Sequence, residues 1–343
     1  MITDNIGGMI DVMNELRSIK GEEVFHYVGM DKSKYILDPI GDIYCGHSNF
    51  MNDKLESWQG CLLFLKYLKK ILSSEPYRVL DSNLRENSAQ AKLSANGYSY
   101  FMPYVWCVMP ERDAVYQWRN YTDKQKGGYC FEFNLKCLKK AIECRNKKID
   151  SYSSLYFAPC FYIDEDDDLI DRFMAGFIEI ARYDLDNIEK NFRTGREIQS
   201  ILDIMAAIFT LAPLFKDRKW CKEQEWRLIL KKSPVIVGQT YERSHLSDIC
   251  GHPFNLMSSI RISPHGNQAE LLHNLQSRIA IPEKSVLVSA VDRRITDYYI
   301  TKEKIDSDYE DYVLDEISNG RGRSIISQEE FLSTHPGEEA SHV

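Results

Sequence analysis

Apolar residues recur every three or four positions over several stretches of the chain, which predicts helices that bury one face. The clearest is residues 55–72, where six large apolar side chains follow the helical period. The helices predicted in this way cover residues 10–17, 34–37, 55–72, 114–121, 169–192 and 197–215. The first is expected to close at Gly21, and the last to be interrupted near Pro213, which cannot continue a helix.

Short apolar or alternating runs between these helices predict strands. They cover residues 23–28, 42–45, 103–109, 127–133, 155–163, 225–230, 258–262 and 285–291. Strands lie on both sides of the two long helices, so residues 165–215 are expected to be a helical insertion in a β-rich core. The fold class predicted is α+β.

The domain organisation follows from this order of elements. We expect an N-terminal helix over residues 1–21, an α+β core over 22–305, and an acidic, polar tail over 306–343. Within the tail, residues 324–332 are compatible with a helix. The polar stretch 73–97 is compatible with a helix that carries an exposed insert.

Composition narrows the class of protein. The 343 residues are 43% hydrophobic, which is ample for a core, and the net charge of −8 argues against a nucleic-acid binder with a basic surface. Nine cysteines without a CxxC pair fit reduced thiols. The first 21 residues lack a signal-peptide pattern, and no apolar run approaches the roughly 20 residues of a spanning helix. We expect a soluble, cytoplasmic protein with no membrane partner.

Several common kinds of site have no motif here. The cysteine and histidine spacings match neither a zinc ribbon nor a zinc finger, so we expect no metal cofactor. The sequence has no Walker loop and no nucleophile elbow. The acidic run 164–168 suits a helix start, where carboxylates interact favourably with the helix dipole.

The most informative candidate chemistry is the series Glu223, Glu225 and Arg227, which runs into an apolar strand. Side chains alternate along a strand, so all three are expected on one face. Two carboxylates this close repel each other unless a cation, a proton or a substrate hydroxyl separates them. The alternative is that Arg227 and nearby lysines neutralise them at a solvated edge.

A second candidate is the early strand that carries His26 and Tyr27, followed by Tyr35 and Tyr44. A cleft lined by these aromatic rings, with one histidine, suits a flat heterocycle and its ribose. The alternative is a core histidine satisfied by the backbone.

Two further segments have both a structural and a functional interpretation. Asn52 and Asp53 precede a long helix, which they are placed to cap, and they follow the His26 strand closely enough to line the same cleft. Trp118 and Tyr121 lead to a glycine turn at 127–128, which serves either a positive φ angle or close approach to a phosphate.

Taken in order, these segments resemble a bacterial family known only as domain of unknown function 2971. The resemblance rests on residues 25–27, 50–56, 118–133 and 219–227, and spans about residues 23–291. Lys54 stands where the family usually has proline after Asn-Asp, and the helical insertion looks long. The family name implies no activity.

A second, weaker resemblance is to the ADP-ribosyltransferase fold, which implies a mixed, mostly antiparallel β core. It also implies NAD as co-substrate. Glu225 would stabilise the oxocarbenium ion formed as nicotinamide leaves, and Glu223 would orient or deprotonate the acceptor.

The same resemblance implies how NAD would be held. His26 would bind ribose, and Tyr27, Tyr35 or Tyr44 would stack on nicotinamide. Arg227 would bind pyrophosphate or brace the two glutamates. The side chains of Asn52, Asp53, Trp118 and Tyr121 complete the predicted binding set.

Three hypotheses follow. The first is an NAD-dependent ADP-ribosyltransferase or NAD glycohydrolase, acting as a bacterial toxin or phage-defence effector on a protein, a nucleic acid or water. The second is a non-catalytic module of a defence system that senses a nucleotide or nucleic acid. In the third, Glu223, Glu225 and Arg227 form a structural or inter-subunit ion-pair network.

Overall fold

The computed structural model describes most of the chain before residue 292. The described residues are 2–37, 44–48, 56–93, 103–146, 154–195, 197–231, 243–245, 256–278, 285–289 and 291. The chain divides into two compact units. The first consists of Met1–His26, Lys34–Arg112 and Glu132–Ser258, and the second of Tyr27–Ser33, Asp113–Phe131 and Ser259–Val343. The predicted tail, and the helix proposed within it, lie outside the described residues.

A five-stranded sheet with the order β5-β8-β3-β2-β9 organises the first unit. Its strands are β2 (Tyr44–His47), β3 (Tyr104–Val108), β5 (Ser154–Pro159), β8 (Trp226–Lys231) and β9 (Arg243–His245). Every neighbouring pair is antiparallel. The interior strand β8, between β5 and β3, is buried along almost its whole length, because side chains pack against both faces of the sheet.

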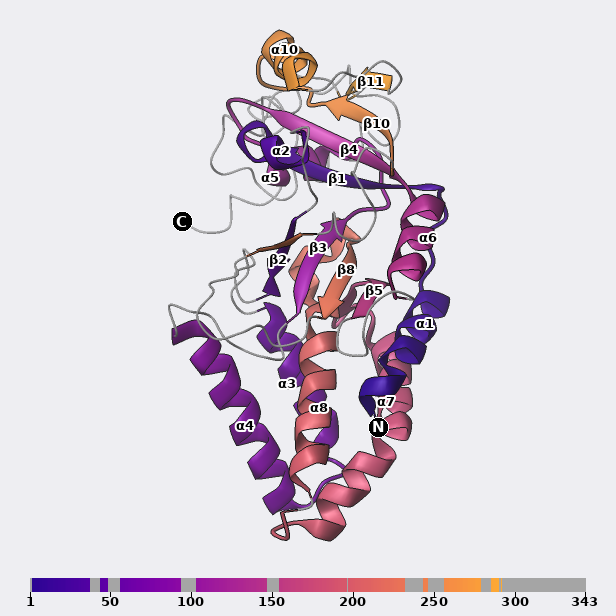
Figure 1. Ribbon diagram of the computed structural model, residues 1–343, viewed down its shortest axis with the longest axis vertical. Helices are drawn as coiled ribbons and strands as arrows, with labels where there is room; N and C mark the ends of the chain where they lie inside the picture. The colour runs from indigo at the N-terminus through magenta and orange to yellow at the C-terminus, as the bar shows by residue number, and fades with distance from the viewer. Residues whose placement is uncertain are drawn as a thin grey trace, which may run out of the picture. The chain divides into compact units, whose positions relative to one another are not determined.

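Helices supply the main hydrophobic core of the first unit. They are α1 (Ile6–Leu16, after the 3-10 turn Ile2–Asn5), α3 (Glu56–Leu68), α4 (Ser74–Leu93), α6 (Leu135–Asn146), α7 (Asp167–Asn191) and α8 (Ile198–Leu211). Figure 1 shows α3, α7 and α8 side by side, and their contacts agree. Phe64 packs edge-on against Phe177 and Phe215, with ring centroids 4.8 and 5.6 Å away. Gly60 lets α3 approach the backbone of Ala212, where any Cβ would clash.

A two-stranded parallel ribbon links this helical core to the sheet. β6 (Phe161–Ile163) pairs with β7 (Phe215–Asp217) so that Tyr162 lies beside Lys216 and Ile163 beside Asp217. Because side chains alternate, the Tyr162–Lys216 pair and the Ile163–Asp217 pair project from opposite faces of the ribbon.

The second unit contains most of a four-stranded sheet with the order β1-β4-β10-β11. Its strands are β1 (Glu23–Gly29), β4 (Gly128–Asn134), β10 (Met257–Ile262) and β11 (Ser285–Val288). The accompanying helices are α5 (Val115–Tyr121), α10 (Gln268–Arg278) and the first half of α2 (Met30–Leu37). The predicted glycine turn is present, with Gly127 at φ +77°. Its conformation favours glycine, and a Cβ there would also clash with Ser263 and His265.

The α+β class and the mostly antiparallel sheets predicted from the sequence are confirmed. Several predicted elements have different bounds. The strand at 155–163 is two strands, because the chain leaves β8 after Pro159 and pairs with β7. The helix predicted to Phe215 ends at Leu211, and Phe215 begins β7. The strand predicted at 42–45 is Tyr44–His47 in the described residues.

Helix α6 (Leu135–Asn146) was not predicted. Its apolar positions are few: Leu138 and Ile142 are buried, and lysines occupy several of the neighbouring positions in the sequence. None of the helices in the described part of the chain has the length and apolarity to span a bilayer.

Candidate functional site

The predicted glutamates come from two different elements. Glu223 ends the 3-10 helix η4 (Arg218–Glu223), and Gln224 then takes a left-handed conformation, with φ +47°. Glu225 immediately precedes β8. The prediction that Glu223 shares a strand face with Glu225 and Arg227 is therefore wrong, because the chain turns at Gln224.

Lys216, on β7, joins the two carboxylates. Its Nζ donates to Oε2 of Glu223, and to Oε2 of Glu225 at 2.7 Å. Arg227 donates to the same Glu225 oxygen from Nε, at 3.2 Å, and from Nη2, at 2.8 Å, and its Nη1 donates to the carbonyl of Pro213. We call Lys216, Glu223, Glu225 and Arg227 the ionic cluster.

The ionic cluster is closed to solvent and balanced in charge. Each of its side chains is at most 5% exposed, and two cations face two carboxylates. The proposed neutralisation by Arg227 and a lysine is therefore present, but it is buried and does not lie at a solvated edge. A buried ion pair is stable only when its partners satisfy each other in this way.

Opposing effects act on the pKa of Glu225. Burial alone would raise it, but Arg227 and Lys216 outweigh burial and lower the pKa from 4.5 to about 2. Glu225 is therefore ionised at neutral pH. Its carboxylate attracts the two cations throughout the physiological range.

Thiols and a phenol surround the ionic cluster. Cys160 Sγ lies 3.9 Å from Glu225 Oε2, and Tyr162 Oη accepts a hydrogen bond from the Glu225 backbone N–H at 2.9 Å. Burial, and secondarily the Glu225 charge, raise the pKa of Cys107 well above its usual value. The Cys107 thiol is therefore protonated, which does not suit a nucleophile.

His26 is half-buried on β1 and differs from the ionic cluster in its bonding. Its Nδ1 lies 2.8 Å from the carbonyl oxygen of Cys107. Burial lowers the pKa of His26 to about 4, against smaller opposing effects of Cys107 and Glu225. A neutral imidazole beside a carbonyl must carry its proton on Nδ1, which leaves Nε2 as an acceptor.

The His26 ring packs on Trp106, with centroids 5.2 Å apart and planes tilted by 46°. Trp106 alternates along β3 with Cys107, and Cys107 is directly opposite Arg227 on β8. The side chains of Trp106 and Arg227 therefore project from opposite faces of the sheet. As a result, His26 packs on Trp106 on one face of the strand pair, and the carboxylate of Glu225 is bonded to Arg227 on the other, although the Glu225 charge still acts on the pKa of His26.

The other predicted binding residues are distributed differently. In the second unit, Tyr27 and Trp118 form a T-shaped pair with centroids 4.9 Å apart. Tyr27 Oη accepts from the Ala114 N–H at 3.0 Å, and Trp118 Nε1 donates to Asp113 at 2.7 Å. Both rings are buried, so they are core residues of this unit.

Tyr121 is half-buried at the end of α5. Tyr35 lies on α2 and Tyr44 on β2. Asn52 and Asp53, and the capping proposed for them, lie outside the described residues.

One segment of the chain matches a known protein family. Residues 117–228 match the sequence model of the family described as Protein of unknown function (DUF2971). The predicted resemblance to this family is confirmed for that segment. The DUF2971 segment contains all four residues of the ionic cluster, whereas His26 and Trp106 precede it. No curated protein and no solved structure matches the chain. Similarity to the ADP-ribosyltransferase fold stays a prediction.

Sequence reasoning did not single out Lys216 or Trp106. Lys216 is seven residues before Glu223 and directly follows the stretch predicted as a helix, so no spacing pointed to it. Trp106 belongs to a continuous apolar run, in which a tryptophan is unremarkable without knowledge of its neighbours. Within the described residues, no group of His, Cys, Asp and Glu side chains could hold a metal ion.

Proposed function

We propose that this chain binds a nucleotide beside His26 and Trp106 without cleaving it, and so acts as a sensing module. The observation that carries the proposal is that His26 and Glu225 belong to opposite faces of the β3–β8 pair. NAD cleavage in the manner of ADP-ribosyltransferases would need one ligand to reach both residues. Separation by a sheet favours binding over cleavage.

The bonding at His26 suits the hydroxyls of a ribose. Its Nε2 is an acceptor, because Nδ1 donates to Cys107. The buried Trp106 Nε1 is a donor with no hydrogen-bond partner among the described residues. A hydroxyl group can both donate and accept, so a ribose would satisfy such groups.

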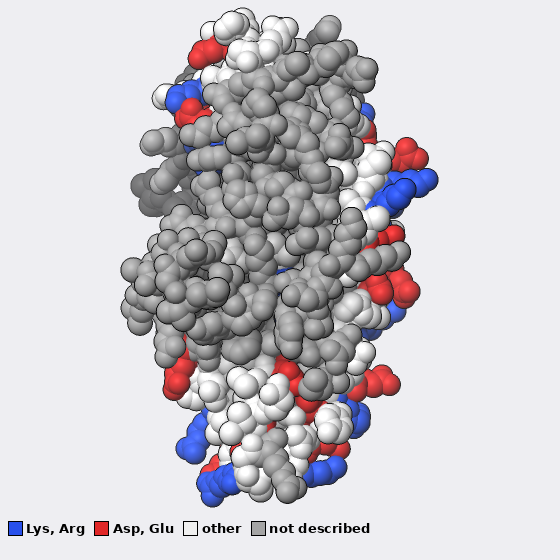
Figure 2. All heavy atoms as spheres, viewed as in Figure 1, with Lys and Arg blue, Asp and Glu red and all other residues white. Residues whose placement is uncertain are grey.

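Charge favours a small nucleotide over a nucleic acid. The chain carries a net charge of −8, and acidic and basic side chains are interspersed in the described regions of the face in Figure 2. Nucleic-acid binding relies on a concentrated basic surface that replaces counterions on many phosphates. In the defence setting that the resemblance implies, a small nucleotide would be the signal.

A second candidate, NAD cleavage through Glu225, is favoured by one observation. The pKa of about 2 keeps Glu225 ionised, as stabilisation of an oxocarbenium ion requires. Lys216 and Arg227 already neutralise this carboxylate, and it is only 2% exposed. NAD would have to displace Lys216 before Glu225 could act.

The test is to titrate the protein with NAD, ADP-ribose and adenosine, following thermal stability and nicotinamide release. We expect stabilisation without release, since a ligand that binds only the folded state raises its apparent stability. His26→Asn should weaken the response, because asparagine can still donate to Cys107 but lacks the Nε2 acceptor. His273→Asn is the matched control, since His273 is exposed on α10.

Each outcome decides between the candidates. Nicotinamide release by wild type that is lost in Glu225→Gln would replace the sensing proposal with the enzymatic one. A nucleotide response equal in wild type and His26→Asn would remove His26 from the site. No response to any of the three ligands would overturn nucleotide binding.

A further inference from the structure

A cavity of about 280 Å³ lies on the face of the β6–β7 ribbon that carries Ile163 and Asp217. The ionic cluster includes Lys216, which projects from the other face, so the cavity and the cluster are separate sites. Helix α3, Asp164 and Arg218 complete its walls. Its volume is near the lower end of the roughly 300–1,000 Å³ typical of small-molecule pockets, which suits a small ligand.

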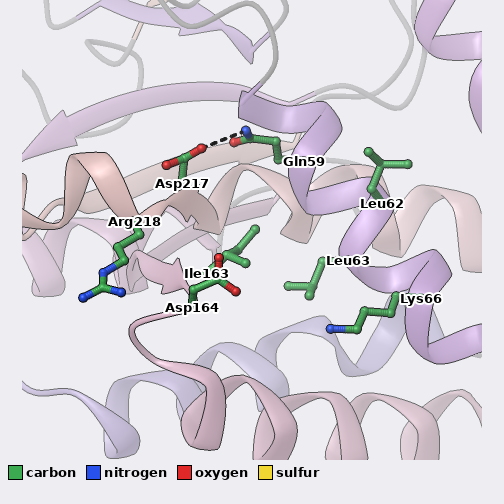
Figure 3. Close-up of a pocket in the computed structure, with 8 residues that line it drawn as sticks. All are labelled: Gln59, Leu62, Leu63, Lys66, Ile163, Asp164, Asp217 and Arg218. Atoms are coloured by element: carbon green, nitrogen blue, oxygen red, sulfur yellow. Dashed lines mark hydrogen bonds between the residues drawn. The ribbon is translucent and has the colours of Figure 1, made fainter.

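Two opposite charges at the cavity have no partner in the described part of the chain. They are the amine of Lys66 and the carboxylate of Asp164. In Figure 3 the Lys66 side chain extends from α3 toward the side where Asp164 lies. The other charged lining residues are already engaged: Asp217 accepts from Gln59 at 3.3 Å, and Arg218 pairs with Glu165 at 3.1 Å.

A buried acceptor also lines the cavity. Gln59 uses Nε2 to donate to Asp217, and its Oε1 is buried without a hydrogen-bond partner among the described residues. An unsatisfied buried acceptor costs free energy, which a donor on a ligand would recover. Together with Asp164, this oxygen favours a ligand that carries a positively charged N–H group.

Apolar side chains form the rest of the lining. Leu62 is 40% exposed although it is a large hydrophobic residue, and Leu63 and Ile163 also line the cavity. Covering such surface releases water and stabilises a complex with an apolar ligand group.

We infer that this cavity binds a small zwitterion with an apolar side chain, of the class of aliphatic α-amino acids. The ligand carboxylate would pair with Lys66, its ammonium with Asp164 and Gln59 Oε1, and its side chain would cover Leu62 and Leu63. The inference is independent of nucleotide binding at His26, because it rests on different residues.

The experiment titrates the protein with L-leucine, its N-acetyl derivative and its amide, followed by calorimetry and thermal stability. We expect L-leucine to bind and each derivative to bind about tenfold more weakly, since each loses one of the two charged groups. Lys66→Met should remove the preference for leucine over the amide. Asp164→Asn should remove the preference over the N-acetyl form.

These variants keep the local structure. Both side chains are exposed, and asparagine tolerates the positive φ of +67° that Asp164 adopts. Lys69→Met and Asp168→Asn are matched controls, because they make the same chemical changes at exposed positions outside the cavity. Both should bind leucine as wild type does.

Equal binding of leucine, its amide and its N-acetyl form would overturn the inference, as would the absence of leucine binding. A loss of leucine binding in the control variants equal to that in Lys66→Met would also overturn it. His26→Asn should leave the leucine response unchanged. A failed nucleotide test with a preserved leucine response would therefore reject nucleotide binding at His26 alone.

Discussion

The polar groups on the two faces of the β3–β8 strand pair differ in their hydrogen bonding. On one face, Glu225 is bonded to Lys216 and Arg227 and is closed to solvent. On the other, His26 is half-buried, and neither its Nε2 acceptor nor the buried Trp106 Nε1 donor has a hydrogen-bond partner among the described residues. The closed network on the first face is what a structural core requires, whereas unsatisfied groups are where a ligand lowers the free energy.

The comparison also separates two meanings of a shifted pKa. Glu225 and His26 both have lowered pKa values, near 2 and near 4. In Glu225 the cations overcome burial and favour the charged form, whereas in His26 burial dominates and favours the neutral form. A perturbed pKa therefore identifies a candidate functional residue, and the cause of the shift shows whether the group serves a structural ion pair instead.

The largest effect on stability should come from removing a cation from the ionic cluster. Arg227→Met leaves Glu225 buried beside a single cation and should lower the free energy of unfolding by about 3–5 kcal/mol, measured by denaturant titration. Arg172→Met makes the same change at an exposed position of α7 and should cost less than about 1 kcal/mol. Equal losses of unfolding free energy in the two variants would mean that the ionic cluster contributes no more to stability than an exposed arginine does.

The loss of folding stability below about pH 4.5 should come from protonation of Glu225. Its folded pKa is below its unfolded value, so its contribution is present above about pH 4.5 and is lost as pH falls through about 2. Up to about 3 kcal/mol is expected in this window. Glu225→Gln should flatten the window, whereas Glu179→Gln, at an exposed position of α7, should leave it intact.

A second pH window should belong to His26. Since burial lowers its pKa from 6.5 to about 4, the unfolded chain binds the extra proton between these values. Stability should fall as pH drops from about 6.5 to 4, and His26→Asn should remove this slope while keeping the lower one. Glu225→Gln should keep or steepen this slope, because the Glu225 charge raises the pKa of His26. A profile that Glu225→Gln flattens between about pH 6.5 and 4 would contradict the assignment of this window to His26.

The smallest effect on stability should come from a substitution on the opposite face, which carries Trp106. Trp106→Phe removes ring volume but also removes a buried donor without a described partner, so the two effects offset each other. We expect a free energy of unfolding within about 1 kcal/mol of wild type, together with a weaker nucleotide response. A loss as large as that of Arg227→Met would mean that this face is a closed core as well.

Much of the element list could be predicted from sequence alone. The apolar period identified α3 and α7, and the continuous apolar run identified β3, because burial imposes these patterns locally. The sequence also pointed to Glu223, Glu225 and Arg227, and to the need for a cation, a proton or a substrate hydroxyl between the carboxylates. Charge repulsion between close carboxylates holds in any fold.

Tertiary structure alone decided which groups meet. Lys216 reaches Glu223 and Glu225 because β7 pairs in parallel with the distant strand β6, a pairing that no local pattern encodes. The register of β3 against β8 likewise assigned Trp106 and Arg227 to opposite faces. A shift of one residue would exchange the faces, so the positions of His26 and Glu225 depend on long-range pairing, while periodicity fixes only the elements that carry them.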